Sequence, residues 1–308
     1  MLDQITHLFR LRIILEEGSL RRATERLGLT QPALSRSLAQ LEAHFGQPLV
    51  ERHARGVKAT PFGARVLKVS NRIERYWDIA THELTVPAGN EKIRLRIGAG
   101  PAWRSGILSP VLVEMQRRFP FLVVEMIPLV FGKALDDLRE GKIDVAYGGI
   151  ISEPFDSANL VSHKLTEVTN QVMARKDHPI FRTATADGTI PSDQLLAYPW
   201  IVYTELPIYR ETTMHAIYER LGRDPDVRLI CQNLLTALTM IQQSDSLCVL
   251  PSLAAIDALS PPVVPIPVAL HLRKADIGMI YRDELTDWEP MAALVDLCRA
   301  HFGTQDLA

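Results

Sequence analysis

Three hydrogen-bonding side chains, Gln31, Ser35 and Arg36, stand near the start of the stretch LTQPALSRSLAQLEAHFG. The apolar residues of this stretch recur at steps of three and four, which is the spacing of one buried stripe on an α-helix: Leu34, Leu38, Leu41 and Phe45. In the major groove of DNA, a glutamine pairs with adenine, an arginine pairs with guanine or a phosphate, and a serine allows close approach. An ordinary amphipathic surface helix would explain the leucines, but not the lack of Lys and Glu pairs on the outer face.

The neighbouring elements place this stretch as the second helix of a helix-turn-helix. We expect helices over about residues 3–17 and 20–28, with Ser19 as the N-cap of the second helix and Gly28 as its terminator. Thr30 then caps the quoted helix, and a proline occupies its first turn, where a missing N–H costs nothing.

The next segment, QPLVERHARGVKATPFG, predicts a short hairpin anchored by Leu49 and Val57. The tip of this hairpin carries Arg52, His53 and Arg55, so we expect a basic wing. Arg55 is placed to enter the minor groove, where a narrow A·T tract concentrates negative potential.

A long helix is predicted from the N-cap Thr60 to about Leu84. Its apolar residues alternate at steps of four and three, as in a coiled-coil seam: Phe62, Val66, Val69, Ile73, Tyr76 and Ala80. The seam favours pairing with a second copy of the chain, and the alternative is packing against its own domain. The segment TVPAGNEK follows as a short linker.

From Lys92 onward strands alternate with helices, which predicts an α/β architecture with parallel strands. The segments KIRLRIGAG, FLVVEMI and IDVAYGG form the strands of a first unit, and a second unit begins near Val168. The glycines of GAGPAW do not form a dinucleotide-binding turn, because Trp103 stands where a third glycine is required.

The distribution of charge and the missing motifs bound the function. Residues 1–70 carry eleven Lys and Arg against six Asp and Glu, whereas the remainder carries 23 against 30, so a polyanion-binding head is joined to an acidic body. The sequence has no G-x-S-x-G elbow, HExxH or phosphate loop, and its three cysteines lack CxxC spacing. It has neither a membrane-length apolar run nor a signal-peptide layout. We expect a cytoplasmic protein that is not an enzyme and holds neither metal nor cofactor.

The stretch GSLRRATERLGLTQPALSRSLAQLEAHFGQPLVERHARGVKATPFG closely resembles the DNA-binding head of LysR-type transcriptional regulators. The resemblance covers Gly18 to Gly63, and Thr24, Val50 and Ala59 depart from the family's usual alanine, phenylalanine and leucine. It implies a winged helix-turn-helix, helical with a small β wing, joined to a two-lobed α/β effector domain similar to periplasmic binding proteins.

The implied division of the chain is a winged helix-turn-helix over residues 1–60, a linker and dimerisation helix over 61–85, a linker over 86–91 and an effector domain over 92–308. Within the effector domain, lobe one would comprise residues 92–167 and 268–308, and lobe two residues 168–267.

Residue patterns and resemblance together nominate the following DNA contacts: Thr30, Gln31, Pro32, Ser35, Arg36, Arg52, Arg55, Arg21 and Arg22. An effector is expected beyond the carboxyl ends of the strands, where it would meet Gly100, Trp103, Arg104, Ser105, Val130, Phe131, Tyr203, Thr204, Glu205 and Asn233. Arg104 would suit a carboxylate and Trp103 a sugar or aromatic ring. The alternative, with Trp103 in the core and Arg104 at the surface, stays open.

The partners that follow from the resemblance are double-stranded operator DNA, a small-molecule effector, RNA polymerase and further copies of the chain in a dimer or tetramer. Two departures prevent the family's effector chemistry from being carried over. Gly100 stands where a serine or threonine often contacts the effector, and SDSLCVLP lacks the common glycines. The rival hypothesis is a ligand-binding or catalytic α/β protein with an incidental helical head.

Overall fold

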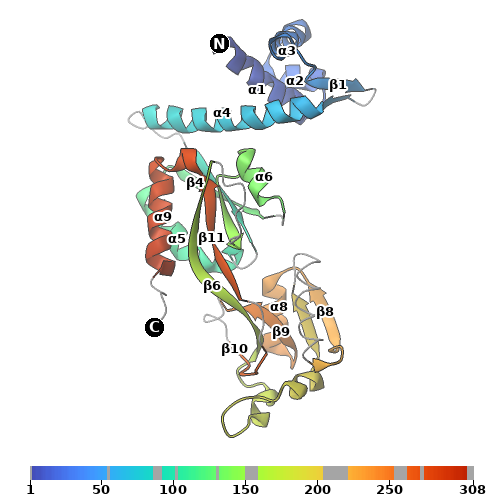
Figure 1. Ribbon diagram of the computed structural model, residues 1–308, viewed down its shortest axis with the longest axis vertical. Helices are drawn as coiled ribbons and strands as arrows, with labels where there is room; N and C mark the ends of the chain where they lie inside the picture. Colours follow the sequence, from blue (N-terminus) through green and yellow to red (C-terminus); the bar gives the residue numbers. More distant parts are fainter. Residues whose placement is uncertain are drawn as a thin grey trace. The chain divides into compact units, whose positions relative to one another are not determined.

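The computed structural model describes residues 2–53, 56–85, 92–100, 103–129, 132–149, 159–203, 221–252, 262–270 and 274–303. Its first part, which we call the head (residues 2–60), appears in dark and mid blue in Figure 1. The described head consists of α1 (Leu2–Glu17), α2 (Leu20–Leu27), α3 (Gln31–Phe45), β1 (Val50–His53) and β2 (Gly56–Ala59). This order is the predicted helix-turn-helix followed by a two-stranded wing.

The turn between α2 and α3 forms for the reasons expected from the sequence. Gly28 adopts the left-handed conformation, with φ 64°, and its N–H bonds to the carbonyl of Thr24, which ends α2. The Thr30 hydroxyl accepts the N–H of Ala33 at 3.4 Å and so caps α3. Ser19 occupies the N-cap position of α2, but its side chain makes no capping bond. The prediction for that hydroxyl was wrong, because only the Ser19 carbonyl, which accepts from Ala23, takes part in the start of the helix.

The core of the head is built on the apolar stripe of α3. Leu34, Leu38 and Leu41 are buried together with leucines and isoleucines of α1, as their spacing predicted. Phe45 differs, because it lies in the last turn of α3 and stays exposed while its ring contacts that of Phe62 at 5.7 Å.

The helix α4 (Pro61–Thr85) begins as predicted at Thr60, whose hydroxyl accepts the N–H of Gly63 and donates to the carbonyl of Pro48, each at 2.8 Å. The head, α4 and the segments up to Arg96, Phe121–Val123 and Leu135–Asp144 form one compact unit, and the remaining residues form a second.

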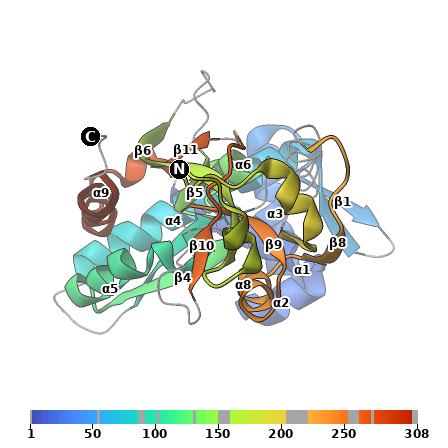
Figure 2. The same ribbon diagram turned by 90° about the horizontal axis from the view of Figure 1, so that it is seen from below.

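The C-terminal region contains the following described strands and longer helices: β3 (Ile93–Ala99), α5 (Ser109–Arg118), β4 (Leu122–Pro128), α6 (Ala134–Arg139), β5 (Val145–Gly149), β6 (Leu160–Arg175), β7 (Trp200–Tyr203), β8 (Val227–Cys231), α8 (Leu234–Gln243), β9 (Leu247–Pro251), β10 (Val263–Pro265), β11 (Lys274–Arg282) and α9 (Glu289–Phe302). The strand order is β4-β3-β5-β11-β6-β9-β7-β8, with β10 paired to β6. Helices α5 and α9 pack together, and α8 lies beside β9 and β10 (Figures 1 and 2).

The sheet combines parallel and antiparallel pairs. Strand β3 is parallel to β5, and β7 is parallel to both β8 and β9, as the alternation of strands and helices predicted. The antiparallel centre is formed by β11 and the 16-residue β6. Strand β6 pairs with β11 up to Thr169 and with β9 from Asn170, so the partners change inside one strand, close to the predicted lobe boundary.

Within the described residues, no helix combines the length and the apolar character that crossing a membrane requires.

Candidate nucleic-acid interface

The outer face of α3 presents polar side chains that the protein itself does not engage. Gln31, Pro32 and Arg36 are exposed, and Ser35 is partly buried. Among the described residues, neither Gln31, Ser35 nor Arg36 has a side-chain hydrogen bond or ion pair. They occupy the first two turns of α3, and the backbone N–H groups of the first turn lack helical partners and favour a nearby anion. This face can therefore offer an amide, a hydroxyl and a guanidinium to an external polyanion.

A buried polar contact that the sequence analysis missed fixes α3 against α1. Ser37 is buried on the inner side of α3, and its hydroxyl lies 2.6 Å from Nδ1 of His7 and 3.3 Å from the Arg10 guanidinium. A serine within an otherwise apolar face was the available signal. The contact orients α3 beside the leucine core, so the polar residues on the opposite side point outward.

The wing is a regular antiparallel hairpin. Its register pairs Arg52 with Val57 and His53 with Gly56. Leu49 and Val57 are buried as anchors, which confirms that prediction, and Arg52 is exposed without a described partner. Arg55 lies outside the described residues. Lys58, which was not among the predicted DNA contacts, is exposed on β2 and adds a second cation to the wing.

The two arginines at the start of α2 differ in availability. The side chain of Arg21 is 81% exposed and has only a loose contact of 3.8 Å with Glu25. Arg22 instead donates to the backbone carbonyl of Glu17 at the end of α1 and lies 3.7 Å from the carboxylate of the same residue. A helix C-terminus attracts a cation, so Arg22 has a structural role that its position in the sequence did not reveal.

The predicted seam of α4 is divided between two environments. Val66 is buried in the core of the head, and Phe62 and Ile73 pack against that core. Val69 and Tyr76 are exposed, and Ala80 is partly buried. The alternative of packing against its own domain therefore holds for Phe62, Val66 and Ile73. Further exposed apolar side chains on α4, Trp77 and Leu84, lie outside the predicted set.

Around the end of β3, the chain turns its largest side chain inward. Trp103 is 2% exposed and packs against the rings of Tyr147 at 5.1 Å and Phe302 at 5.3 Å. Its ring is a core element, as the alternative interpretation held, and is not open to stack on a sugar. Arg104 is partly buried, and its Nε donates to the carbonyl of Ala99 at 3.1 Å.

The other residues nominated for an effector are only partly described. Gly100 follows β3 and donates its N–H to the carbonyl of Tyr147, Tyr203 ends β7, and exposed Asn233 caps α8 by accepting the N–H of Thr236 at 3.2 Å. Val130, Phe131, Thr204 and Glu205 lie outside the described residues, as does the side chain of Ser105.

The titratable groups of the described C-terminal region include two that are buried, Cys298 and His178. No group of three His, Cys, Asp or Glu side chains in this part of the chain could hold a metal ion. Cys298 is buried beside the hydroxyl of Tyr147 at 3.1 Å, and burial raises the pKa of the Cys298 thiol to about 11. His178 is buried too, and desolvation lowers the pKa of its imidazole. These groups favour packing over chemistry.

A winged helix-turn-helix with an open polar helix face, joined to an α/β sheet domain, defines a DNA-binding protein with a ligand-binding module. Residues 5–64 match the bacterial regulatory helix-turn-helix proteins of the lysR family, and residues 88–303 match the LysR substrate binding domain. The chain therefore belongs to the LysR family of DNA-binding transcriptional regulators.

Curated relatives cover nearly the whole chain. The probable HTH-type transcriptional regulator LrrA of Synechococcus elongatus is 28% identical over 87% of this chain and 85% of its own length. The HTH-type transcriptional regulator TdcA of Escherichia coli K12 is 25% identical over 98% of this chain and 94% of its own.

Solved structures share the fold. ArgP from Mycobacterium tuberculosis has a TM-score of 0.70 at 18% identity and covers 96% of both chains. A full-length OxyR variant from Pseudomonas aeruginosa has a TM-score of 0.68 at 20% identity and covers 99% of this chain and 98% of its own.

Proposed function

We propose that α3 reads operator DNA in the major groove through Gln31, Ser35 and Arg36, with Thr30 and Pro32 at the start of the helix close to a phosphate. The observation that carries the proposal is the polar face of α3, which is exposed and has no described protein partner while its opposite face is buried. A short amide and an arginine fork on one helix face fit the edges of adenine and guanine.

The wing and α2 supply sequence-independent contacts. Arg52, Lys58 and Arg21 are exposed and either unpaired or loosely paired, which suits them to phosphates. Arg55 is proposed for the minor groove on the strength of its place in the sequence. Such contacts release counterions, so affinity falls as salt increases.

The test begins with fragments selected from a random DNA library by the full-length chain. Arg36→Ala should weaken binding to the selected fragment by about tenfold to a hundredfold while leaving random DNA nearly unchanged, because a base contact is worth ~1–3 kcal/mol. Gln40→Ala, an exposed residue of the same helix, is the matched control and should bind as the parent does. If selection yields no preferred sequence, or if both variants behave alike, α3 does not read bases.

For the effector, we propose a small anion at the carboxyl ends of β3 and β7, near Gly100, Arg104, Tyr203 and Asn233. The support is the usual place of ligands beyond strand ends in open α/β sheets and the nearby guanidinium. A panel of small carboxylates should include one that raises the melting temperature of the full-length chain. That shift should disappear in Arg104→Gln, whereas equal shifts in both proteins would place the anion elsewhere.

For assembly, we propose that the exposed apolar residues of α4 pair with a second copy of the chain: Val69, Tyr76, Trp77 and Leu84. Trp77→Asp should dissociate the oligomer in light scattering, and Trp77→Phe should leave it intact. Ile73→Asp would not answer the question, because Ile73 packs on the core of the head. We further propose that the protein acts in the cytoplasm, by binding and not by catalysis, and that its operator complex acts on RNA polymerase.

A further inference from the structure

Two consecutive residues of α4, Glu74 and Arg75, contact different parts of the chain. Glu74 meets Arg12 of α1, on the side of the head, whereas Arg75 meets Asp144, just before β5. Successive side chains of a helix project about 100° apart, so the two residues can make contacts on different sides of α4 at the same level. We propose that Arg75 is a positioning residue, which fixes the DNA-binding head to the Asp144 segment of the effector domain through α4.

Arg75 and Asp144 form a buried, bidentate ion pair. Arg75 Nε donates to Oδ1 at 2.7 Å and Nη2 donates to Oδ2 at 2.8 Å, with the side chains 3% and 0% exposed. Arg75 also donates to the carbonyl of Arg94, and Asp144 accepts the backbone N–H of Arg96 at 2.8 Å. A planar guanidinium held by a carboxylate and a carbonyl fixes direction as well as distance.

Other residues on the same face of α4 as Arg75 also contact the segments Phe121–Val123 and Leu135–Asp144. Lys68, Asn71, Arg75 and His82 follow one another at steps of three, four and seven, which places them on one helix face. Lys68 pairs with Glu140 at 2.7 Å, and the ring of His82 lies 4.6 Å from that of Phe121.

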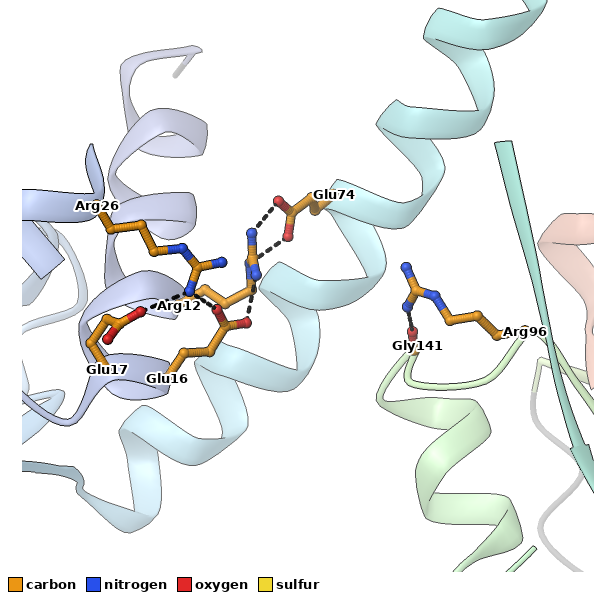
Figure 3. Close-up of polar contacts among 7 residues, drawn as sticks. All are labelled: Arg12, Glu16, Glu17, Arg26, Glu74, Arg96 and Gly141. Carbon is orange, nitrogen blue, oxygen red and sulfur yellow. Dashed lines mark hydrogen bonds and ion pairs between the residues drawn. The ribbon is translucent and has the colours of Figure 1, made fainter. Parts of the chain in front are cut away.

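At the centre of the stripe the two backbones approach closely. A Cβ on Gly141, which has φ 68°, would lie 3.5 Å from the backbone of Asn71. The Gly141 carbonyl is held in turn by Arg96 at 3.1 Å (Figure 3). The contact therefore extends along α4 on both sides of the buried Arg75–Asp144 pair.

On the side of the head, a chain of ion pairs joins α4 to α1 and α2. Arg12 bonds Glu74 at 2.6 Å and also Glu16, and Arg26 bridges Glu16 and Glu17 at 2.9 and 3.1 Å (Figure 3). These groups are partly exposed, so solvent weakens them, and the head relies on its leucine core as well. The buried pair on the other side is the stronger determinant of orientation.

This arrangement gives α4 a second task beside assembly. A shift of the Asp144 segment must either move Arg75, and α4 with it, or leave a buried charge without its partner, which is costly. The orientation of α3 would then follow the state of lobe one. This consequence rests on the proposed DNA-reading role of α3, whereas the joint itself does not.

The joint can be tested without DNA by pulsed electron paramagnetic resonance on the full-length chain. Spin labels are placed on cysteines introduced at exposed Ala43 of α3 and exposed Asp136 of α6, with Cys231→Ser removing the partly exposed native thiol. Each labelled chain is diluted into unlabelled chain, so that only the distance within one subunit is measured.

Four backgrounds are compared: the parent, Arg75→Met, the apolar pair Arg75→Met with Asp144→Leu, and Lys68→Met. The apolar pair leaves no buried charge, so it keeps the chain folded if Arg75→Met alone does not. Lys68→Met is the matched control, since it removes a partly exposed ion pair between α4 and the same segment of the chain.

The parent and Lys68→Met should give one narrow distance. In the variant with Arg75→Met and Asp144→Leu, the distance distribution should be at least twice as wide as in the parent. The melting temperature of this variant should match that of the parent. Amide exchange in α4 should also become about tenfold faster there, with α1 to α3 unchanged. A narrow distance in the apolar pair, or equal broadening in Lys68→Met, would overturn the proposal. The DNA-binding measurement on Arg36→Ala tests base contact by α3 separately. Failure of that proposal would therefore not affect the proposed role of Arg75, and the reverse also holds.

Discussion

The side chains of the head predicted DNA contacts, and those after β3 predicted effector contacts. In the structure most of the first set is exposed, whereas the largest side chain of the second set is buried. On α3, Gln31 and Arg36 remain exposed above buried Leu34 and Leu38. After β3, Trp103 is buried within the core. The difference lies in what a pattern determines. Helical spacing assigns each side chain to an inner or outer face, whereas a residue just after a strand can turn either way.

The local backbone explains the turn of Trp103. The carbonyl of Gly100 accepts the N–H of Arg104, and residues Trp103–Ile107 form a π-helical turn. That turn carries the indole onto Tyr147 and Phe302.

Replacing Trp103 by alanine should have the largest effect, because it empties a core site. We expect Trp103→Ala to lower the free energy of unfolding by ~3–5 kcal/mol in urea denaturation. Leu235→Ala, at a side chain that is 68% exposed, is the control and should change that free energy little. A loss below ~1 kcal/mol for Trp103→Ala would contradict the core role of the indole and favour its role as a ligand contact.

Replacing Gln31 should leave stability intact and change sequence preference. We expect Gln31→Ala to lose ~1–3 kcal/mol of discrimination at one base position of the selected operator, measured by binding to a series of single-base variants. The midpoint of thermal unfolding should stay where it is. A uniform loss at all positions would assign Gln31 to the phosphates instead.

Lowering the pH should destabilise lobe two because His178 becomes protonated. Its Nδ1 accepts the N–H of Ile180 at 3.0 Å, so the folded state holds the neutral ring, and burial lowers the pKa below the ordinary value. The contribution is present above pH 6.5 and is lost as pH falls through the lowered folded pKa. Asp245 raises the pKa of His178 and so opposes the effect of burial, whereas Arg175 lowers that pKa further.

We expect the free energy of unfolding to fall by about 1 kcal/mol for each unit by which pH drops below 6.5, until the folded pKa is reached. His178→Gln should flatten this dependence, and His301→Gln, at an exposed position, should not. Identical pH profiles for the parent and His178→Gln would mean that another group titrates.

The smallest effect is expected at the wing. Arg52→Ala should weaken operator and random DNA alike and reduce the slope of log affinity against log salt by about one. Fluorescence anisotropy over a salt series measures both quantities. An unchanged slope would show that Arg52 does not reach a phosphate.

Much of the head was predictable because its determinants are local. Gly28, Thr30 and Thr60 act within a few residues of their own positions, and the leucines of α3 follow one period. The role of Arg22 was not evident, because its partner is a backbone carbonyl of the preceding helix. The continuous β6 escaped prediction for another reason: its pairing changes along its length, so no single periodicity describes it.

Long-range pairs were beyond the sequence. Arg75 and Asp144 are 69 positions apart, and no local pattern in the sequence relates them. Only the contacts of α4 with Arg94 and Asp144 show the two residues to be buried together.

The adjacency of Glu74 and Arg75 also constrains how this chain can change length. Inserting one residue into α4 ahead of them would turn both side chains by about 100° relative to the head. An insertion of seven residues, almost two turns, nearly restores their facing but moves Glu74 about 10 Å along the helix axis, out of reach of Arg12. If both contacts are to be kept, chains descended from this one must preserve the length of α4 between the head and Glu74, so variation in length is expected on the far side of Arg75 or in other segments.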